Sequence, residues 1–402
     1  MISLLKAPLS LLLAGGMLLP AGRVQKGVVI EGIAVGGQKY EVAEQVVREK
    51  IKSELAPLTV HTPEGDVSFS LQFQDNLHEL VRRAKKDESL SVEVKREWVT
   101  MEEDIAALCA KNARLAQDAE VTFSSAGFTY QAEKAGTYCD YQKALALAEE
   151  GLKSGEFTLP VGEYLPSVTE KILRERTRLL SRFTTYFDAG NTARAGNIAL
   201  AASRIAGTVL EAGEEFSFNG TVGARTVENG FGEASVILEG KFVPGVGGGV
   251  CQASTTLMNA ALRAGLEITE SRPHSLSVGY VPPSLDAMVS SSSDLRFRNP
   301  YPFPVYINAR TQGGSVTFSV YGMRDGKKYE TESHVLYRIA PPPAAEVESE
   351  PCEAKEGLAS ESYLLVYDES GKLLSRKLFR RDKYAPVQER KVKEEPQPAP
   401  LL

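Results

Sequence analysis

The sequence predicts a multidomain α+β protein. Its 402 residues are too many for one ordinary hydrophobic core, so we expect two to three domains. The composition, 43% hydrophobic and 24% charged, is typical of a globular protein. Segments with helical periodicity also precede segments that alternate apolar and polar residues. We therefore expect small α+β modules first, and then a domain whose central helix packs on an antiparallel sheet.

The charge balance and the N-terminus restrict the compartment and the partners. A net charge of −6 and a pI near 5.6 argue against nucleic acid as a partner. Lys6 precedes an apolar run at 7–21, and small residues end that run. We interpret residues 1–22 as an export signal, with an uncleaved membrane anchor as the alternative. Either interpretation predicts an extracytoplasmic protein of the cell envelope.

Four cysteines are then exposed to an oxidising compartment, which permits disulfides. Cys109 lies on the apolar face of a predicted helix, and Cys139 follows a turn in the same region. A disulfide between them would stabilise the fold by roughly 3 to 4 kcal/mol. The alternative is two buried free thiols in one core. Cys251 and Cys352 have no obvious partner except each other.

The order of elements predicts the domain boundaries. Residues 23–165 contain repeated strand and helix patterns, without a constellation of residues typical of catalysis. Residues 166–335 form the main domain, which is rich in glycine loops and ends in alternating strands. Residues 336–402 contain a proline-rich linker, a β-hairpin and a tail predicted to be disordered.

The main domain is organised around residues 245–275. The glycine run that contains Gly248 and Gly249 delivers Cys251 to the start of a helix predicted for 252–264. A thiol at a helix N-terminus is near the positive end of the helix dipole, which favours thiolate. A short strand follows, and His274 is predicted to begin a second strand. This arrangement would place a nucleophilic thiol at the start of a helix and a histidine base on a following strand.

Further residues precede this stretch and are predicted to line a polar groove near the centre of the domain. They are Arg194, Asn197, Phe216, Asn219 and Arg225. The alternative is that Arg194 and Asn197 bind the carbonyl groups of the loops beneath the helix.

A family can be named from these residues. The motifs FSFN, GGGVCQASTT, the His274–Ser275 pair and the spaced Asp286 and Asp294 resemble the VanW family, over roughly residues 182–320. The strand and helix modules before it resemble the peptidoglycan-binding domain that often precedes a VanW domain. The resemblance implies a bacterial envelope protein whose partner is peptidoglycan or its precursors. The turn before Asp286 departs from the family pattern, because it lacks the usual glycine.

The order of Cys251, His274 and Asp286 is also similar to transglutaminase-like and papain-like enzymes. In those enzymes a thiolate at a helix N-terminus is paired with an imidazole that a carboxylate orients. Cys251 would be the nucleophile, His274 the base and Asp286 the orienting group, with Asp294 in reserve. Gly248, Gly249 and Gln252 would line the site, and the Gln252 side chain and the backbone amides of Gly249 and Val250 would act as oxyanion donors.

The alternative interpretation of the same residues is that they have only a structural role. Cysteine is among the most buried residue types, and a glycine run also permits a tight turn. The spacing of cysteine, histidine and aspartate matches no metal-ligand motif, and the glycine stretch lacks the ending of a phosphate loop. We therefore expect no metal or other cofactor. Two hypotheses remain: a protein that binds peptidoglycan, or a Cys–His–Asp amidase or transpeptidase that acts on wall stem peptides. The enzyme requires the Cys251 thiol to lie within hydrogen-bonding reach of the His274 ring.

Overall fold

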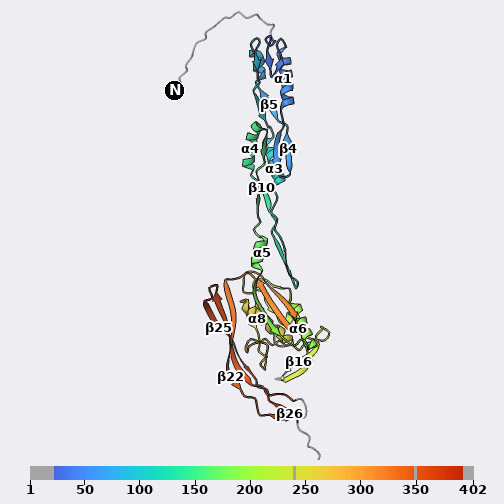
Figure 1. The fold of residues 1–402 in the computed structure, drawn as a ribbon, viewed down its shortest axis with the longest axis vertical. Coiled ribbons are helices and arrows are strands. Elements are labelled where there is room, and N and C mark those ends of the chain that lie inside the picture. The colour runs from blue at the N-terminus through green and yellow to red at the C-terminus, as the bar shows by residue number, and fades with distance from the viewer. Residues whose placement is uncertain (1–21, 239–240, 348–350, 393–402) are drawn as a thin grey trace, which may run out of the picture. The chain divides into compact units, whose positions relative to one another are not determined.

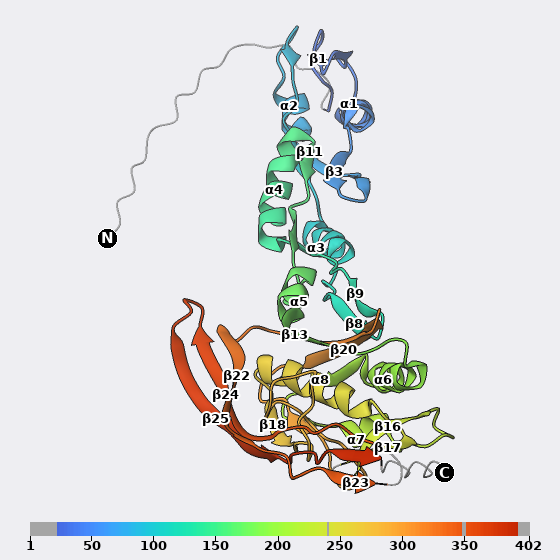
Figure 2. The same ribbon diagram turned by 60° about the horizontal axis from the view of Figure 1, so that its bottom comes forward.

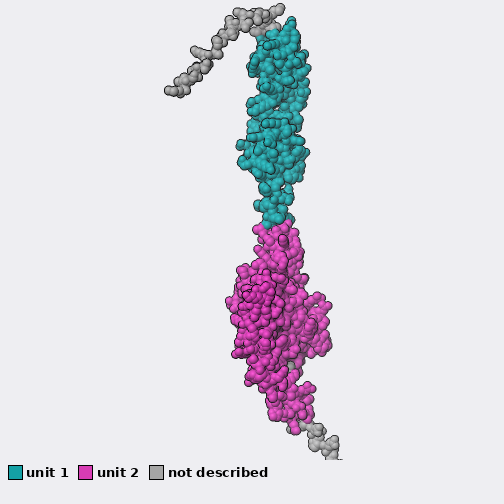
Figure 3. All heavy atoms as spheres, turned by 60° about the vertical axis from the view of Figure 1, so that its left-hand side comes forward, with its two compact units in different colours: residues 1–117, 134–166 teal, residues 118–133, 167–402 magenta. Residues whose placement is uncertain are grey.

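The computed structural model describes residues 22–238, 241–347 and 351–392. The predicted export segment, apart from Gly22, and most of the predicted tail therefore lie outside the described residues. The chain divides into two compact units, coloured separately in Figure 3: residues 1–117 with 134–166 form unit 1, and residues 118–133 with 167–402 form unit 2. Within the described part of the chain, no helix combines the length and apolar character needed to cross a bilayer.

Unit 1 contains short strands and four helices, as the α+β modules predicted for this region require. The helices are α1 (Tyr40–Glu54), α2 (Leu77–Arg83), α3 (Met101–Asn112) and α4 (Tyr141–Ser154). The strands are β1 (Val29–Ile30), β2 (Ile33–Ala34), β3 (Leu58–Thr62), β4 (Gly65–Phe69), β5 (Gln72–Asp75), β6 (Ser89–Leu90), β7 (Val94–Glu97), β10 (Gly136–Cys139), β11 (Glu156–Thr158) and β12 (Val161–Tyr164).

Unit 1 has two separate hydrophobic cores. The first forms where Val47 and Ile51 of α1 meet Leu77 and Val81 of α2. The second forms around α3, α4 and the parallel pair β3–β11. A disulfide between Cys109 of α3 and Cys139 of β10 borders this second core. Each core is small, so a covalent link adds stability that limited apolar burial cannot supply.

Unit 2 contains the remaining elements. Its helices are α5 (Glu170–Arg176), α6 (Thr192–Ile205), α7 (Phe218–Val222) and α8 (Val250–Arg263). Its strands are β8 (Glu120–Ser124), β9 (Gly127–Gln131), β13 (Arg178–Tyr186), β14 (Thr208–Leu210), β15 (Glu215–Ser217), β16 (Glu233–Leu238), β17 (Lys241–Val246), β18 (Glu267–Glu270), β19 (Arg296–Arg298), β20 (Val305–Gln312), β21 (Ser315–Gly322), β22 (Lys327–Ile339), β23 (Ala345–Val347), β24 (Gly357–Asp368), β25 (Leu373–Tyr384) and β26 (Arg390–Val392).

The centre of unit 2 is an antiparallel sheet covered by two helices. The sheet has the strand order β13-β21-β20-β14, and α6 and α8 pack against it (Figures 1 and 2). The prediction of a central helix on an antiparallel sheet within an α+β protein is confirmed. On the opposite face of the sheet, Phe128 of the β8–β9 hairpin packs edge-on against Tyr306 and Tyr321.

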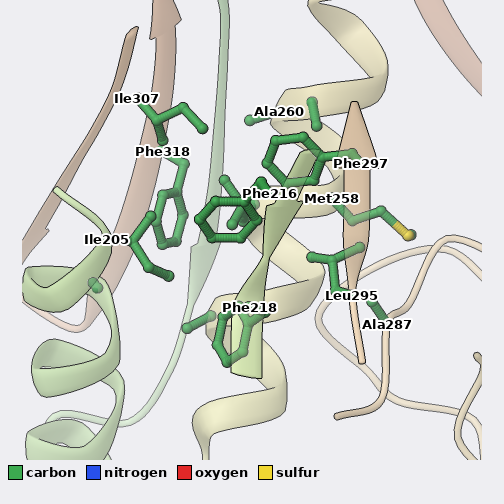
Figure 4. Packing of buried hydrophobic residues seen from close by; sticks show 14 of the residues in the cluster. Ile205, Phe216, Phe218, Met258, Ala260, Ala287, Leu295, Phe297, Ile307 and Phe318 are labelled. Carbon is green, nitrogen blue, oxygen red and sulfur yellow. The ribbon is translucent and has the colours of Figure 1, made fainter. Parts of the chain in front are cut away.

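The main core lies between this sheet, α8 and the small sheet β15-β19-β18. Phe216 lies between Phe318 and Met258 (Figure 4), and its ring stacks on that of Phe297 at 4.7 Å between centroids. Residues of this size contribute about 1.5 to 3 kcal/mol each when fully buried. The helix α8 is buried from Val250 to Leu262 except for a partly exposed Cys251. It therefore gives the residues at its N-terminus a rigid support.

Two details of the structure differ from the sequence predictions. Residues 274–281 were predicted to form a strand, and this is wrong, because the segment is irregular. Its flanking prolines, Pro273 and Pro282, lack an N–H group for a strand ladder, and the amide of His274 instead donates to the Asp286 carboxylate. The domain boundaries also differ: the β8–β9 hairpin and the C-terminal hairpin β24–β25 both belong to unit 2.

Candidate active site

A glycine turn places Cys251 at the first turn of α8. Gly247 and Gly249 have φ values of 86° and 101°, a region that other residues rarely adopt. Gly248 has a different constraint, because a Cβ there would lie 2.6 Å from the backbone carbonyl of Ala234 and from the carbonyl oxygen of Ser235. The glycine run is therefore required both for the turn and for close packing on β16.

The buried side chain of Asn197 fixes this turn from beneath. Its amide nitrogen donates to the carbonyl oxygens of Gly232 and Gly248, at 3.0 and 2.9 Å. Its amide oxygen accepts from the Gly232 N–H at 2.8 Å. Asn197 thus holds loop carbonyls, as one of the two sequence interpretations expected, and its hydrogen-bonding groups are occupied within the scaffold.

The side chain of Gln252 also uses its hydrogen-bonding groups within the scaffold. It accepts a hydrogen bond from Arg194 at 2.7 Å and donates its two amide hydrogens to Thr185 and to the carbonyl of Tyr186. Neither hydrogen is left for an oxyanion, which argues against that predicted role. The Val250 amide is also used, since it donates to the Gly247 carbonyl. Of the predicted oxyanion donors, only the Gly249 amide has no such bond within the described residues.

The polar face of α8 binds the segment that carries Asp286. Ser254 donates to the carbonyl of Ala287 at 2.6 Å, and Thr255 accepts from the Ala287 N–H at 2.9 Å. One turn later, Asn259 donates to the carbonyl of Leu285 at 2.7 Å. These buried hydrogen bonds replace a regular strand ladder and fix the backbone on both sides of Asp286.

Cys251, His274 and Asp286 meet at this point, from three different parts of unit 2. The Asp286 oxygen Oδ2 lies 2.6 Å from Nδ1 of His274 and also accepts the His274 backbone N–H at 2.7 Å. The Cys251 thiol lies beside the same imidazole, and each of the two groups stabilises the charged form of the other. The thiol sulfur also contacts the backbone carbonyl and N–H of Val289, at 3.4 and 3.5 Å.

The electrostatics of the three groups favour a thiolate–imidazolium pair. Burial raises the pKa of the Cys251 thiol, but the hydrogen bond and charge of His274 outweigh it and bring the pKa below its ordinary value. Burial lowers the pKa of His274, whereas Asp286 and Cys251 stabilise the imidazolium and raise that pKa to about 9. Despite burial, the pKa of Asp286 lies below its usual value because of His274, Arg380 and Tyr384.

Three residues of the site were missed by sequence reasoning. Tyr384 donates to the second Asp286 oxygen, Oδ1, at 2.6 Å, and Arg380 reaches the same oxygen at 3.0 Å. Both belong to β25, about a hundred residues after Asp286. Tyr280 lines the same pocket as the thiol, and burial raises the pKa of its hydroxyl so that it stays protonated. Its segment, which we had interpreted as a strand, gave no pattern that marks a site residue.

The thiol opens into a pocket of about 800 Å³. Arg194, Arg225 and Lys355 contribute to its lining, together with the glycine turn, His274 and Tyr280. No Asp or Glu is among the lining residues that the structure describes. Arg194 and Arg225 hydrogen-bond to the neutral amides of Gln252 and Asn219, so the pocket wall next to the thiol carries positive charge.

Asn219 and Asp294 support this wall. Asn219 donates to the carbonyls of Ser290 and Ser293, and its oxygen accepts from Arg225 at 2.5 Å. Asp294 accepts hydrogen bonds from the backbone N–H of Asn219 and from the Ser217 hydroxyl, which fixes the start of α7. Asp294 does not contact His274 in the structure. Among the described residues, no cluster of three or more His, Cys, Asp and Glu is arranged to hold a metal ion.

Comparison with known proteins agrees with the motifs of this domain. Residues 193–321 match the family described as VanW like protein. The chain carries a VanW domain. A protein of Bacillus subtilis (strain 168), described as "Uncharacterized protein YoaR", is 41% identical over 173 residues. The aligned region covers 42% of this chain and 57% of that protein, so this chain spans little more than half the length of its relative. No solved structure matches.

Proposed function

We propose that this VanW protein is a cysteine-nucleophile acyl-transfer enzyme that acts on amide bonds of peptidoglycan stem peptides. The observation that carries the proposal is the pairing of the Cys251 thiol with His274, whose ring Asp286 holds in place. A buried cysteine that served only for packing would need neither a partner imidazole nor an opening into a pocket. The cell-wall substrate and the extracytoplasmic location rest on the family resemblance and on the N-terminal sequence.

The geometry supports a two-step reaction. The Cys251 thiolate attacks the carbonyl carbon of the amide, forming a C–S bond and a tetrahedral oxyanion. When this intermediate collapses, the C–N bond breaks and the His274 imidazolium gives its proton to the leaving amine. A second amine, or water, then attacks the thioester and passes a proton to His274, and the thiolate leaves. Asp286 stays ionised throughout and stabilises the imidazolium that is present before the first step and restored by the second.

The pocket indicates which acyl donors fit. A wall with Arg194 and Arg225, and with no carboxylate among its described lining residues, favours an anionic ligand. Stem peptides carry free carboxylates, so their charge suits this wall. An enzyme that transfers the acyl group to an amine is a transpeptidase, and one that transfers it to water is an amidase. Both acceptors react with the same thioester.

The same cationic pocket also favours a second candidate, the binding of wall peptides without turnover. This candidate uses the volume and the positive charge of the pocket but not the Cys251–His274 pair. The two functions therefore differ in what happens when the thiol is removed while the pocket is kept.

The test compares Cys251→Ala with Cys352→Ser, which removes the other free cysteine of the described chain. Purified stem-peptide fragments are incubated with each variant, products are separated by mass, and binding to isolated sacculi is measured in parallel. We expect Cys251→Ala to lose at least about 1000-fold in turnover and to keep binding, since loss of a nucleophile removes the covalent route. Cys352→Ser should match the parent chain.

Mass spectrometry of the trapped parent protein should also show the acyl group on the peptide that contains Cys251. Turnover that survives in Cys251→Ala contradicts the enzyme. Binding by the parent chain with no turnover of any stem-peptide fragment supports the second candidate instead.

A further inference from the structure

We propose that the C-terminal hairpin β24–β25 is a working part of the active site, in which Tyr384 and Arg380 are positioning residues that hold Asp286 against His274. The inference rests on the proposed function, because it concerns the same three groups. It also extends the site beyond the VanW match, which ends at residue 321. The hairpin was predicted from sequence only as a separate C-terminal element.

The Tyr384 hydroxyl has a fixed direction. It accepts the N–H of Ser284 at 2.7 Å, so its single hydrogen is free to be donated, and it lies 2.6 Å from Oδ1 of Asp286. Tyr384 is only 1% exposed, so water does not compete for either bond. A phenol in this position fixes the rotation of the Asp286 carboxylate about its Cβ–Cγ bond.

Arg380 holds both ends of the same residue. Its Nη2 donates to Oδ1 of Asp286 at 3.0 Å and to the Asp286 backbone carbonyl at 2.5 Å. Its Nε lies 2.6 Å from Asp382, which keeps the guanidinium in place. The two carboxylate oxygens of Asp286 thus have separate tasks: Oδ1 binds the hairpin, and Oδ2 binds the ring and the amide of His274.

Hydrogen bonds attach the hairpin to both ends of the segment that links His274 to Asp286. The Ala385 N–H donates to the carbonyl of Ser275, next to His274. Ser360 shares a hydrogen bond with the Ser284 hydroxyl, and Ser362 donates to the Ser284 carbonyl, both fully buried. Attachment at residues 275 and 284 fixes the span that precedes Asp286, which a hairpin that only covered a core would not require.

A purely structural hairpin would make a different prediction. Loss of a packing contact changes the stability of the fold but leaves the acid–base behaviour of a thiol in the remaining folded protein unchanged. Loss of a positioning residue lets the Asp286 carboxylate rotate, and its bond to Nδ1 of His274 weakens. The imidazolium then loses its partner, and the thiolate of Cys251 becomes less favourable.

The experiment measures the rate of Cys251 alkylation by iodoacetamide against pH, in full-length chains that carry Cys352→Ser so that one free cysteine of the described chain remains. Tyr384→Phe removes one hydroxyl. The matched control is Tyr363→Phe on β24, whose hydroxyl donates to Glu361 at 2.6 Å and does not contact Asp286. Thermal melting is recorded for each chain.

We expect Tyr384→Phe to alkylate about 10-fold more slowly at pH 7, with its transition shifted to higher pH, because a buried hydrogen bond to a charged group is lost. Tyr363→Phe should follow the parent profile. In turnover of stem peptides, kcat should fall with KM unchanged. If the alkylation profile of Tyr384→Phe coincides with that of Tyr363→Phe, the hairpin only packs against the site and the inference is wrong.

Should Tyr384→Phe not fold, Arg380→Lys decides the question in the same assay. Lysine keeps the positive charge but has one donor centre in place of the forked guanidinium, so a positioning role predicts an intermediate shift of the profile. An unchanged profile overturns the inference. Alkylation needs no substrate, so a parent chain that turns over no wall peptide contradicts the proposed function without affecting this test.

Discussion

The residues that the structure describes include two histidine–aspartate pairs, one in each unit, and their geometry is similar. In unit 1, Nδ1 of His61 lies 2.8 Å from Asp66 on the hairpin β3–β4. In unit 2, Nδ1 of His274 lies 2.6 Å from Asp286. The surroundings differ: the side chains of His61 and Asp66 are 39% and 63% exposed, whereas those of His274 and Asp286 are 5% and 1% exposed.

This difference shows that the pairing itself does not make a catalytic group. Water screens the exposed pair, whose second ring nitrogen meets the carboxylate of Glu156 and has no group to activate. The ring of His274 interacts with a thiol, and its aspartate is fixed by Tyr384 and Arg380 through the oxygen that the ring does not use. Burial, a reactive neighbour and an oriented carboxylate separate the site from the surface ion pair.

Neutralising the two aspartates is the strongest test of this comparison. Asp286→Asn should lower acyl transfer by about 1000-fold, because an amide does not stabilise the imidazolium and disturbs the orientation of the ring. Asp66→Asn, an identical chemical change at the exposed pair, should leave turnover unchanged. Turnover and melting temperature are measured for both variants. Equal losses in the two variants would show that burial of the second pair has no catalytic consequence.

Much of the central arrangement could be predicted from sequence. The glycine run and the periodicity after it placed a helix at 252–264, within two residues of α8. Chain order suggested that Cys251, His274 and Asp286 meet, and the structure brings them together. These predictions depend on local patterns, which a single sequence displays directly.

The rest depends on contacts that no local pattern encodes. Tyr384 and Arg380 reach Asp286 from a hairpin strand that is rich in charged residues, as exposed strands often are. His274 was predicted in a strand because its segment alternates, but the buried side chains Ser254, Thr255 and Asn259 bind the neighbouring backbone instead of a strand partner. Polar residues within a helix are usually predicted to face solvent, so their tertiary role could not be anticipated.

The cysteines extend the comparison of the two units, since unit 1 holds a disulfide and unit 2 a free thiol at its site. Replacing both Cys109 and Cys139 by serine should destabilise unit 1 by about 3 kcal/mol, because its loop of 30 residues is no longer closed in the unfolded chain. Urea unfolding, monitored at Trp98 of unit 1, measures this loss. Alkylation of Cys251 should keep the parent rate. A slower rate would show that unit 1 supports the site.

The pH dependence of activity compares the protonation of the two histidines, His274 and His61. Acyl transfer needs the Cys251 thiolate and the His274 imidazolium together, so turnover should rise through the lowered pKa of the thiol and fall above pH 9, where His274 loses its proton. The fall should approach about tenfold per pH unit. A pH profile of kcat/KM from pH 5 to 10.5 measures both limbs, and Asp66→Asn should leave them in place, although Asp66 raises the pKa of His61. A descending limb near pH 6.5, the ordinary value for a solvated imidazole, would mean that Asp286 does not hold the proton on His274.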